Sequence, residues 1–171
     1  MCSSDLNAKS DVELPATVVV SAQSRRASIT IVPQGNLAWK YHYDWNYRPG
    51  DRAAKHDDKH IYRLPYPNGR SYTVMQGYDG KFSHHGEQQF ALDFKLPLGS
   101  KVCAARGGTV IATRDDSDEG GRDRDEYLFK ANYVRILHED GSVGSYVHLQ
   151  HEGALVKVGD QVHSGQLIGL S

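Results

Sequence analysis

Short runs of β-branched and aromatic residues recur along this chain of 171 residues, and turn-forming Gly, Pro, Asp and Asn residues separate them. No segment shows the 3.6-residue period of apolar positions that is typical of an amphipathic helix. In the first half such runs lie at residues 16–22, 27–33, 37–47 and 60–66. In the second half they lie at residues 71–78, 89–96, 101–105, 108–114, 133–138, 145–149 and 166–170. We therefore predict an all-β protein.

The strand pattern is interrupted by a cluster of turn residues, Pro65-Tyr66-Pro67-Asn68-Gly69, which predicts a domain boundary. We expect a small β-sandwich-like accessory domain over residues 11–66 and an antiparallel sheet domain over residues 67–171. Within the second domain, Asp140-Gly141 predicts a tight hairpin turn, because both residue types tolerate the positive φ angles that such turns need.

Five aromatic residues alternate with polar residues in the segment 37–47, so they share one face of a strand. They are Trp39, Tyr41, Tyr43, Trp45 and Tyr47. A face of this kind is typical of a sandwich core, and a platform for stacking sugars is the alternative.

The first six residues, Met1 to Leu6, resemble a translated sequencing adapter. We therefore expect residues 1–10 to be non-native or disordered. A missing signal peptide then says nothing about localisation. The two cysteines, Cys2 and Cys103, are too few for a disulfide framework.

The charge balance argues against nucleic-acid binding, because 20 Lys and Arg residues face 21 Asp and Glu residues, giving a net charge of -1. The longest apolar run, at 16–22, is far shorter than the roughly 20 residues of a transmembrane helix. Asp115 to Asp125 is rich in acidic residues but lacks the ligand spacing of an EF-hand, so a solvated loop is favoured over a calcium site. We expect a monomer without a membrane span.

Two features are candidates for chemistry. Asp93 lies between Leu92 and Phe94 in an apolar run, where a carboxylate needs exposure, an ion pair or a metal, and His84 and His85 precede it. His148 shares a strand face with Tyr146 in the run Tyr146-Val147-His148-Leu149, a pattern of a strand that lines a groove. For each residue taken alone, an exposed or structural position is the alternative. His138 and His151 adjoin turns and are interpreted as structural.

Several separated motifs follow one another in a defined order. They are Phe82-Ser83-His84, Phe90-Ala91-Leu92-Asp93-Phe94, Leu96-Pro97-Leu98-Gly99, Asn132-Tyr133-Val134, Tyr146-Val147-His148-Leu149 and Gly165-Gln166-Leu167-Ile168-Gly169. Over residues 71–171 the chain resembles the lysostaphin-type zinc endopeptidases, a family of murein endopeptidases.

The resemblance implies a small antiparallel β domain that binds one zinc ion and hydrolyses peptide stems or cross-links of bacterial peptidoglycan. It implies His84 and Asp93 as zinc ligands, with His85 as the alternative to His84, and places the protein in the cell envelope, periplasmic or secreted. The commoner spacing of the motif falls on Gln89, which is not a zinc ligand.

The resemblance also implies that His148 is the family's catalytic but non-ligating histidine, which would assist the attacking water or the developing oxyanion. Asn132 and Tyr146 are candidates for contact with the substrate backbone, and a plain strand position is the alternative. We predict that His84, Asp93 and His148 lie within a few ångströms of one another.

In the family, the third zinc ligand comes from a His-Leu-His motif beyond the Gly-Gln-x-Ile-Gly segment, and this motif does not occur before the last residue, Ser171. We therefore expect a fragment of a longer zinc endopeptidase that is inactive as it stands. The alternative is a degenerate homologue that binds peptidoglycan or regulates another murein hydrolase.

Overall fold

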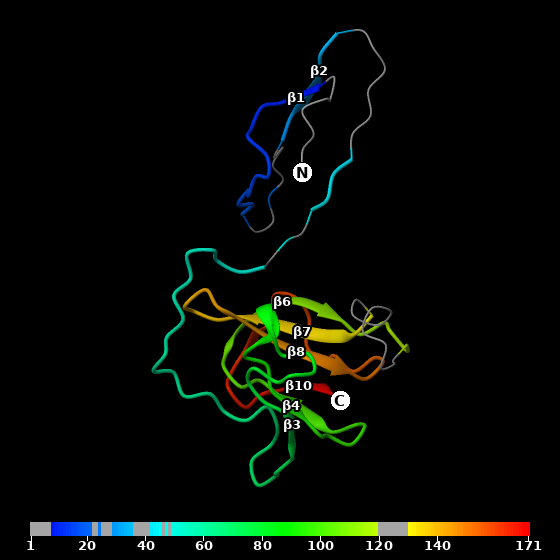
Figure 1. Ribbon diagram of the computed structural model, residues 1–171. Helices are drawn as coiled ribbons and strands as arrows, with labels where there is room; N and C mark the ends of the chain where they lie inside the picture. Colours follow the sequence, from blue (N-terminus) through cyan, green and yellow to red (C-terminus); the bar gives the residue numbers. More distant parts are fainter. Residues whose placement is uncertain are drawn as a thin grey trace. The chain divides into compact units, whose positions relative to one another are not determined.

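The computed structural model describes residues 8–21, 24, 29–35, 42–45, 47, 49–119 and 130–171. Its backbone contacts divide the chain into two compact units, residues 1–47 and residues 48–171 (Figure 1). No α-helix occurs in the described ranges, so the predicted all-β class is confirmed. None of these ranges contains a helix able to cross a bilayer.

In the first unit, β1 (Ala8–Ser10) pairs antiparallel with β2 (Ile31–Pro33). The backbone N–H of Thr30 donates to the Asp11 carboxylate at 2.8 Å and extends this pairing by one residue. Ala8 to Ser10 are thus ordered in a strand, although we expected disorder up to residue 10. The earlier residues lie outside the described ranges.

The predicted N-terminal sandwich is not seen in the described part of the first unit, which contains β1 and β2 and no strand at 16–21 or 42–45. Tyr43, Trp45 and Tyr47 are exposed, and Trp45 has 72% of its surface accessible. Their prediction as a buried core is wrong, because no second sheet covers them among these residues. Trp39 and Tyr41 lie outside the described residues.

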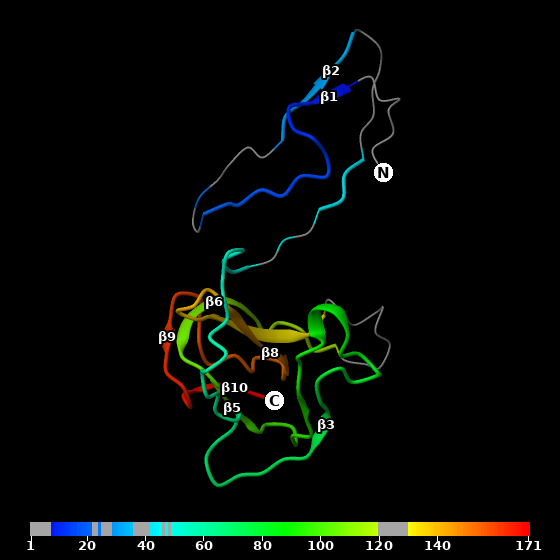
Figure 2. The same ribbon diagram turned by 60° about the vertical axis from the view of Figure 1, so that its left-hand side comes forward.

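The second unit is built around a four-stranded antiparallel sheet in the order β8-β7-β6-β9, with two smaller pairs, β10-β5 and β3-β4. The strands are β3 (Val74–Gln76), β4 (Asp93–Phe94), β5 (Lys101–Cys103), β6 (Gly108–Arg114), β7 (Asn132–Leu137), β8 (Val143–Leu149), β9 (Gln161–Val162) and β10 (Leu167–Leu170). One 3-10 turn, η1 (Gly86–Gln88), precedes β4. Figures 1 and 2 show β6, β7 and β8 as one layer, with the smaller pairs on one side of it.

The core lies between these layers because alternate residues of the strands point inward. In β7, Asn132, Val134 and Ile136 are buried, while the residues between them are partly exposed. The cluster comprises Val102, Ala104, Val110, Val134, Ile136, Leu149, Val162 and Ile168. Most of these positions lie in the strands that the alternation predicts.

The predicted hairpin turn joins β7 to β8. Gly141 has φ +81°, a region that L side chains rarely adopt, and the N–H of His138 donates to the Ser142 carbonyl at 2.8 Å. The acidic stretch predicted to be a solvated loop is described only as far as residue 119; the rest of it lies outside the described residues.

The segment 48–66 belongs to the second unit, whereas the turn cluster predicted a boundary at Tyr66. The N–H of Arg63 donates to the Ala105 carbonyl, and the N–H of Cys103 donates to the Pro65 carbonyl, both at 3.0 Å. Tyr66 is itself buried, with its ring edge-on to those of Tyr72 and Phe94. The turn residues therefore mark a loop attached to the sheet domain.

Candidate metal site

His84 and Asp93 lie nine positions apart in the sequence, and their side chains meet in the second unit. The Nε2 atom of His84 lies 3.1 Å from Oδ1 of Asp93. His84 is 3% exposed and comes from the loop before η1, while the Asp93 side chain, at the start of β4, keeps 42% of its surface accessible. One partner is thus fixed in the protein and the other faces solvent.

The orientation of the His84 ring follows from its second nitrogen. Nδ1 lies 2.8 Å from the carbonyl oxygen of Gly77. A carbonyl only accepts hydrogen bonds, so Nδ1 carries a proton, and Nε2 is the nitrogen that faces Asp93. At 3.1 Å, Nε2 and Oδ1 of Asp93 need a proton or a cation between them. A backbone carbonyl on the far nitrogen is the usual arrangement for a metal-binding histidine.

The donor set and its spacing fit zinc, which binds His nitrogen and carboxylate oxygen at about 2.0–2.2 Å. For two ligands of a tetrahedral site, these lengths give a separation of about 3.3 Å between the donor atoms. The observed 3.1 Å is close to that value. Within the described ranges no group of three or more His, Cys, Asp or Glu side chains stands close enough to hold a metal.

The two neighbouring histidines differ in their surroundings. His85 is exposed and forms no ion pair with any carboxylate of the described residues, whereas His84 faces Asp93. At Gln89, the position of the commoner spacing, the backbone carbonyl oxygen accepts a hydrogen bond from the N–H of Asp79. Of the residues weighed from the sequence, His84 is the one in contact with the carboxylate.

Gln76 was not among the predicted site residues, yet its side chain reaches Asp93. It lies at the end of β3, opposite Asp93 in the register of the β3-β4 pair, and its Nε2 donates to Asp93 Oδ2 at 3.1 Å. An uncharged amide at the end of a strand gives no signal in the sequence, because the pairing of β3 with β4 is what brings it to the site.

His148 lies near the end of β8 with φ +64°, in the left-handed region that non-glycine residues rarely adopt. Asn132 pairs with Leu149 and Tyr133 pairs with Val147, so β7 skips His148 and β8 bulges there. A bulge turns a side chain out of the regular alternation. Val147 and His148 are both exposed and Leu149 is buried, so the side chains do not alternate regularly at the end of β8.

Backbone strain of this kind clusters at functional sites. The conformation of His148 thus marks it as an exceptional position in β8, which the alternation did not reveal. Its closeness to His84 and Asp93 stays a prediction.

Asn132 and Tyr146, the candidates for substrate contact, have their polar groups engaged in the fold. Asn132 is 4% exposed; its Nδ2 donates to the carbonyls of Ser117, Leu149 and Gln150, and its Oδ1 accepts from the N–H of Ser117. These bonds hold the start of β7 against Ser117 and against the end of β8. Substrate contact by Asn132 stays a prediction, and the bonds observed are structural.

Tyr146 is in a similar position. Its hydroxyl oxygen accepts the N–H of Ala105 at 2.6 Å, its ring packs against the core, and burial raises the pKa of its phenol. Contact of this residue with substrate likewise stays a prediction.

A second polar cluster surrounds His138, which is buried and whose Nδ1 donates to the Gly107 carbonyl at 2.8 Å. Burial lowers the pKa of its imidazole, since the charged form would lose its hydration. The structural role predicted for His138 agrees with these contacts.

Next to it, a guanidinium nitrogen of Arg106 lies 2.7 Å from the Asp140 carboxylate and 3.2 Å from the Tyr62 hydroxyl. The Ser142 hydroxyl and the Asp57 N–H, followed by Arg106, hold the pKa of Asp140 well below its usual range. Through Tyr62 and Asp57 this cluster fastens the segment 48–66 to the turn between β7 and β8.

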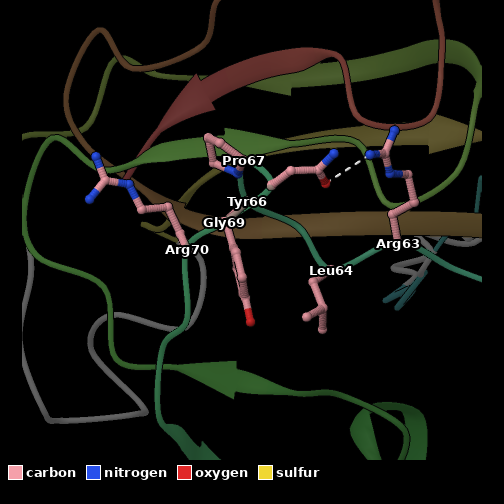
Figure 3. Close-up of a pocket in the computed structure, with 7 residues that line it drawn as sticks. Arg63, Leu64, Tyr66, Pro67, Gly69 and Arg70 are labelled. Carbon is pink, nitrogen blue, oxygen red and sulfur yellow. Dashed lines mark hydrogen bonds between the residues drawn. The ribbon is translucent and has the colours of Figure 1, made fainter.

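A cavity of about 250 Å³ lies along the loop 63–70 (Figure 3). Arg63 and Arg70 flank it, and Arg63 donates to the Asn68 side chain at 2.8 Å. None of the predicted site residues lines this cavity. Its link to the metal site is indirect, through the ring contact of Tyr66 with Phe94, the neighbour of Asp93.

The chain is similar in sequence to known peptidases. Residues 87–171 match the pattern of peptidase family M23. The chain is 30% identical over 110 residues to the peptidoglycan DD-endopeptidase ShyA of Vibrio cholerae, which covers 62% of this chain and 23% of that protein. It is 34% identical over 77 residues to the peptidoglycan DD-endopeptidase ShyC of the same species, covering 45% of this chain and 15% of ShyC.

A third relative is an uncharacterized metalloprotease of Buchnera aphidicola, 29% identical over 80 residues, or 47% of this chain and 18% of that protein. The chain thus spans less than a quarter of the length of the curated relatives it matches. The ordered motifs, the antiparallel β domain and these matches agree: residues 87–171 are a domain of peptidase family M23, the lysostaphin-like murein endopeptidases.

Proposed function

We propose that residues 67–171 form the domain of a zinc-dependent endopeptidase that hydrolyses peptide bonds in the stems or cross-links of bacterial peptidoglycan. The observation that carries this proposal is the contact between His84 Nε2 and Asp93 Oδ1 at 3.1 Å, with the far nitrogen of His84 held by Gly77. The named activity of the two Vibrio cholerae relatives supports the substrate class. Such a substrate places the protein in the cell envelope.

In this proposal His84 and Asp93 hold the metal. When bound, zinc supplies Lewis acidity toward the scissile carbonyl. The buried ring of His84 cannot rotate without breaking its bond to Gly77, so Nε2 is already oriented. Asp93 contributes Oδ1, because Gln76 engages its other oxygen.

His148 acts as the general base. Its exposed imidazole can take a proton from the attacking water and return it to the leaving amine, the role for which a neutral histidine is suited near pH 7. The bulge in β8 presents this side chain away from the regular strand face.

A second candidate is a homologue that binds peptidoglycan without cutting it. One observation favours it: His84 and Asp93 supply two ligands, catalytic zinc sites have three protein ligands, and the described ranges bring no third one to them.

The test is digestion of purified murein sacculi with the zinc-loaded protein, followed by separation of the muropeptides. It uses this chain and, where the source gene continues past Ser171, the longer protein. An endopeptidase converts cross-linked dimers to monomers. Binding to sacculi without release of monomers would instead support the second candidate.

Two variants test the residue roles. In a full-length version that digests sacculi, we expect Asp93→Ala to lose both zinc and activity, and His148→Ala to keep zinc and lose activity by about 10²- to 10⁴-fold. Zinc content is measured by atomic absorption, and Ser145→Ala on the same strand is the control. Full activity in both variants would refute the mechanism.

A further inference from the structure

We propose that Gln76 is a positioning residue of the metal site, one that holds the Asp93 carboxylate and the loop bearing His84 in a single arrangement. This inference rests on the proposed function of His84 and Asp93 as metal ligands. It is carried by the contacts of the Gln76 carboxamide with both segments.

The nitrogen of the carboxamide donates in two directions. Nε2 of Gln76 lies 2.8 Å from the hydroxyl oxygen of Ser83 and 3.1 Å from Oδ2 of Asp93. An amide NH₂ group has two hydrogens, so both have a partner. One bond reaches β4 and the other reaches the residue before His84.

The oxygen of the carboxamide accepts from the same loop. Oε1 of Gln76 lies 3.1 Å from the backbone nitrogen of Phe82 and 3.3 Å from that of Ser83. The side chain therefore uses all its donors and acceptors, and its orientation is determined. A flipped amide would set its NH₂ group against two N–H donors and its oxygen against a carboxylate.

These bonds decide what Asp93 can offer a cation. Because Gln76 engages Oδ2, the carboxylate presents Oδ1 toward His84. The next residue of the chain, Gly77, accepts from Nδ1 of His84. The end of β3 thus orients both proposed ligands, one through a side chain and the other through the backbone.

A substitution at Gly80 offers a second, independent way to displace the Gln76 side chain. A Cβ added at Gly80 would lie 2.2 Å from Cγ and 2.7 Å from Cδ of Gln76. The backbone of Gly80 does not have a positive φ, so an alanine there is not strained by its own conformation. Its effect would come from displacing Gln76.

The experiment measures zinc affinity by isothermal titration of the full chain with Zn²⁺. Gln76→Met keeps the length of the side chain and removes the amide. We expect it to bind Zn²⁺ about 10- to 100-fold more weakly, as for other residues that hydrogen-bond metal ligands. The matched control is Gln161→Met on β9, where the amide bonds to Thr109 and which we expect to leave zinc affinity unchanged.

The Gly80→Ala variant tests whether displacing the Gln76 side chain weakens zinc binding. In the natural background we expect Gly80→Ala to weaken Zn²⁺ binding by a similar factor, whereas in the Gln76→Ala background, which lacks Cγ, it should have little further effect. Additive losses in the double variant would show that Gly80 does not act through Gln76 and would count against the proposal.

The outcomes distinguish the two levels of inference. Wild-type affinity in Gln76→Met, in a protein where Asp93→Ala abolishes zinc binding, overturns the role of Gln76 alone. If the natural chain binds no Zn²⁺ at all, the proposed metal site fails and the role of Gln76 with it. A loss of affinity in Gln76→Met, with unchanged thermal unfolding of the metal-free protein, supports the positioning role.

Discussion

Two histidines of the second unit, His84 and His148, have arrangements that are unusual for residues of a β domain. His84 is buried with its far nitrogen fixed, and His148 has a positive φ in the bulge of β8. Strain at His148 persists only if the surrounding sheet compensates for it. The cost of this backbone conformation to folding stability can therefore be measured separately from the chemical role of the His148 imidazole.

We expect His148→Gly to be more stable than His148→Ala by about 1 kcal/mol, because an L side chain in the left-handed region costs roughly 1–2 kcal/mol and glycine does not bear that cost. Both variants lack the imidazole, so the difference isolates the backbone. The measurement is urea unfolding of each variant.

The control pair is at Ser145, an exposed residue of β8 without a positive φ. There the order should reverse, with the glycine variant less stable by about 0.5–1 kcal/mol. If the order at position 148 matched that at 145, His148 would not be strained in solution.

The buried His138 predicts a dependence of stability on pH. Burial lowers the pKa of its imidazole, so the unfolded chain binds the proton more readily. The stabilising contribution of the neutral ring is therefore complete above the unfolded pKa of about 6.5 and is lost as pH falls below it. From pH 7.5 to 5.5 we expect a loss of at most about 1.4 kcal/mol.

In the variant His138→Asn, an amide can still donate to the Gly107 carbonyl but does not titrate in this range. We expect the free energy of unfolding to vary less between the two pH values than in the natural protein. His163→Asn, at an exposed site, should keep the natural dependence. A pH dependence that is the same in His138→Asn would assign the effect to other groups.

At the scale of elements, the function of the site depends on where strands end. Gln76 and Gly77 come at the end of β3, Asp93 begins β4, and His148 stands next to the end of β8. Strand alternation located most of the second unit's strands, because one face of each is buried. It did not predict the bulge at His148, since a bulge is a property of the pairing between β7 and β8.

At the scale of the whole molecule, the boundary at residue 47 rather than 66 has a measurable consequence. Removing residues 1–47 should leave the melting temperature of the second unit unchanged. Removing residues 1–66 also deletes the buried Tyr66 and the bonds of Tyr62, Arg63 and Pro65 to the sheet domain. We expect this second deletion to cost at least about 3 kcal/mol, the usual loss for a buried aromatic side chain.

Thermal unfolding of the two shortened proteins measures this difference. Equal melting temperatures would favour the boundary that the turn cluster predicted. A lower melting temperature for the shorter protein alone would assign the segment 48–66 to the peptidase domain.

The sequence by itself determined the all-β class, the Asp140-Gly141 hairpin and the ordered motifs of the family, because these depend on local periodicity, turn chemistry and the residue types themselves. The tertiary structure alone decided that His84 faces Asp93, that Gln76 holds the carboxylate and that residues 48–66 pack with the sheet domain. The physical reason is that each of these features is a contact between segments distant in sequence, and pairing register and burial select such contacts only in the folded chain.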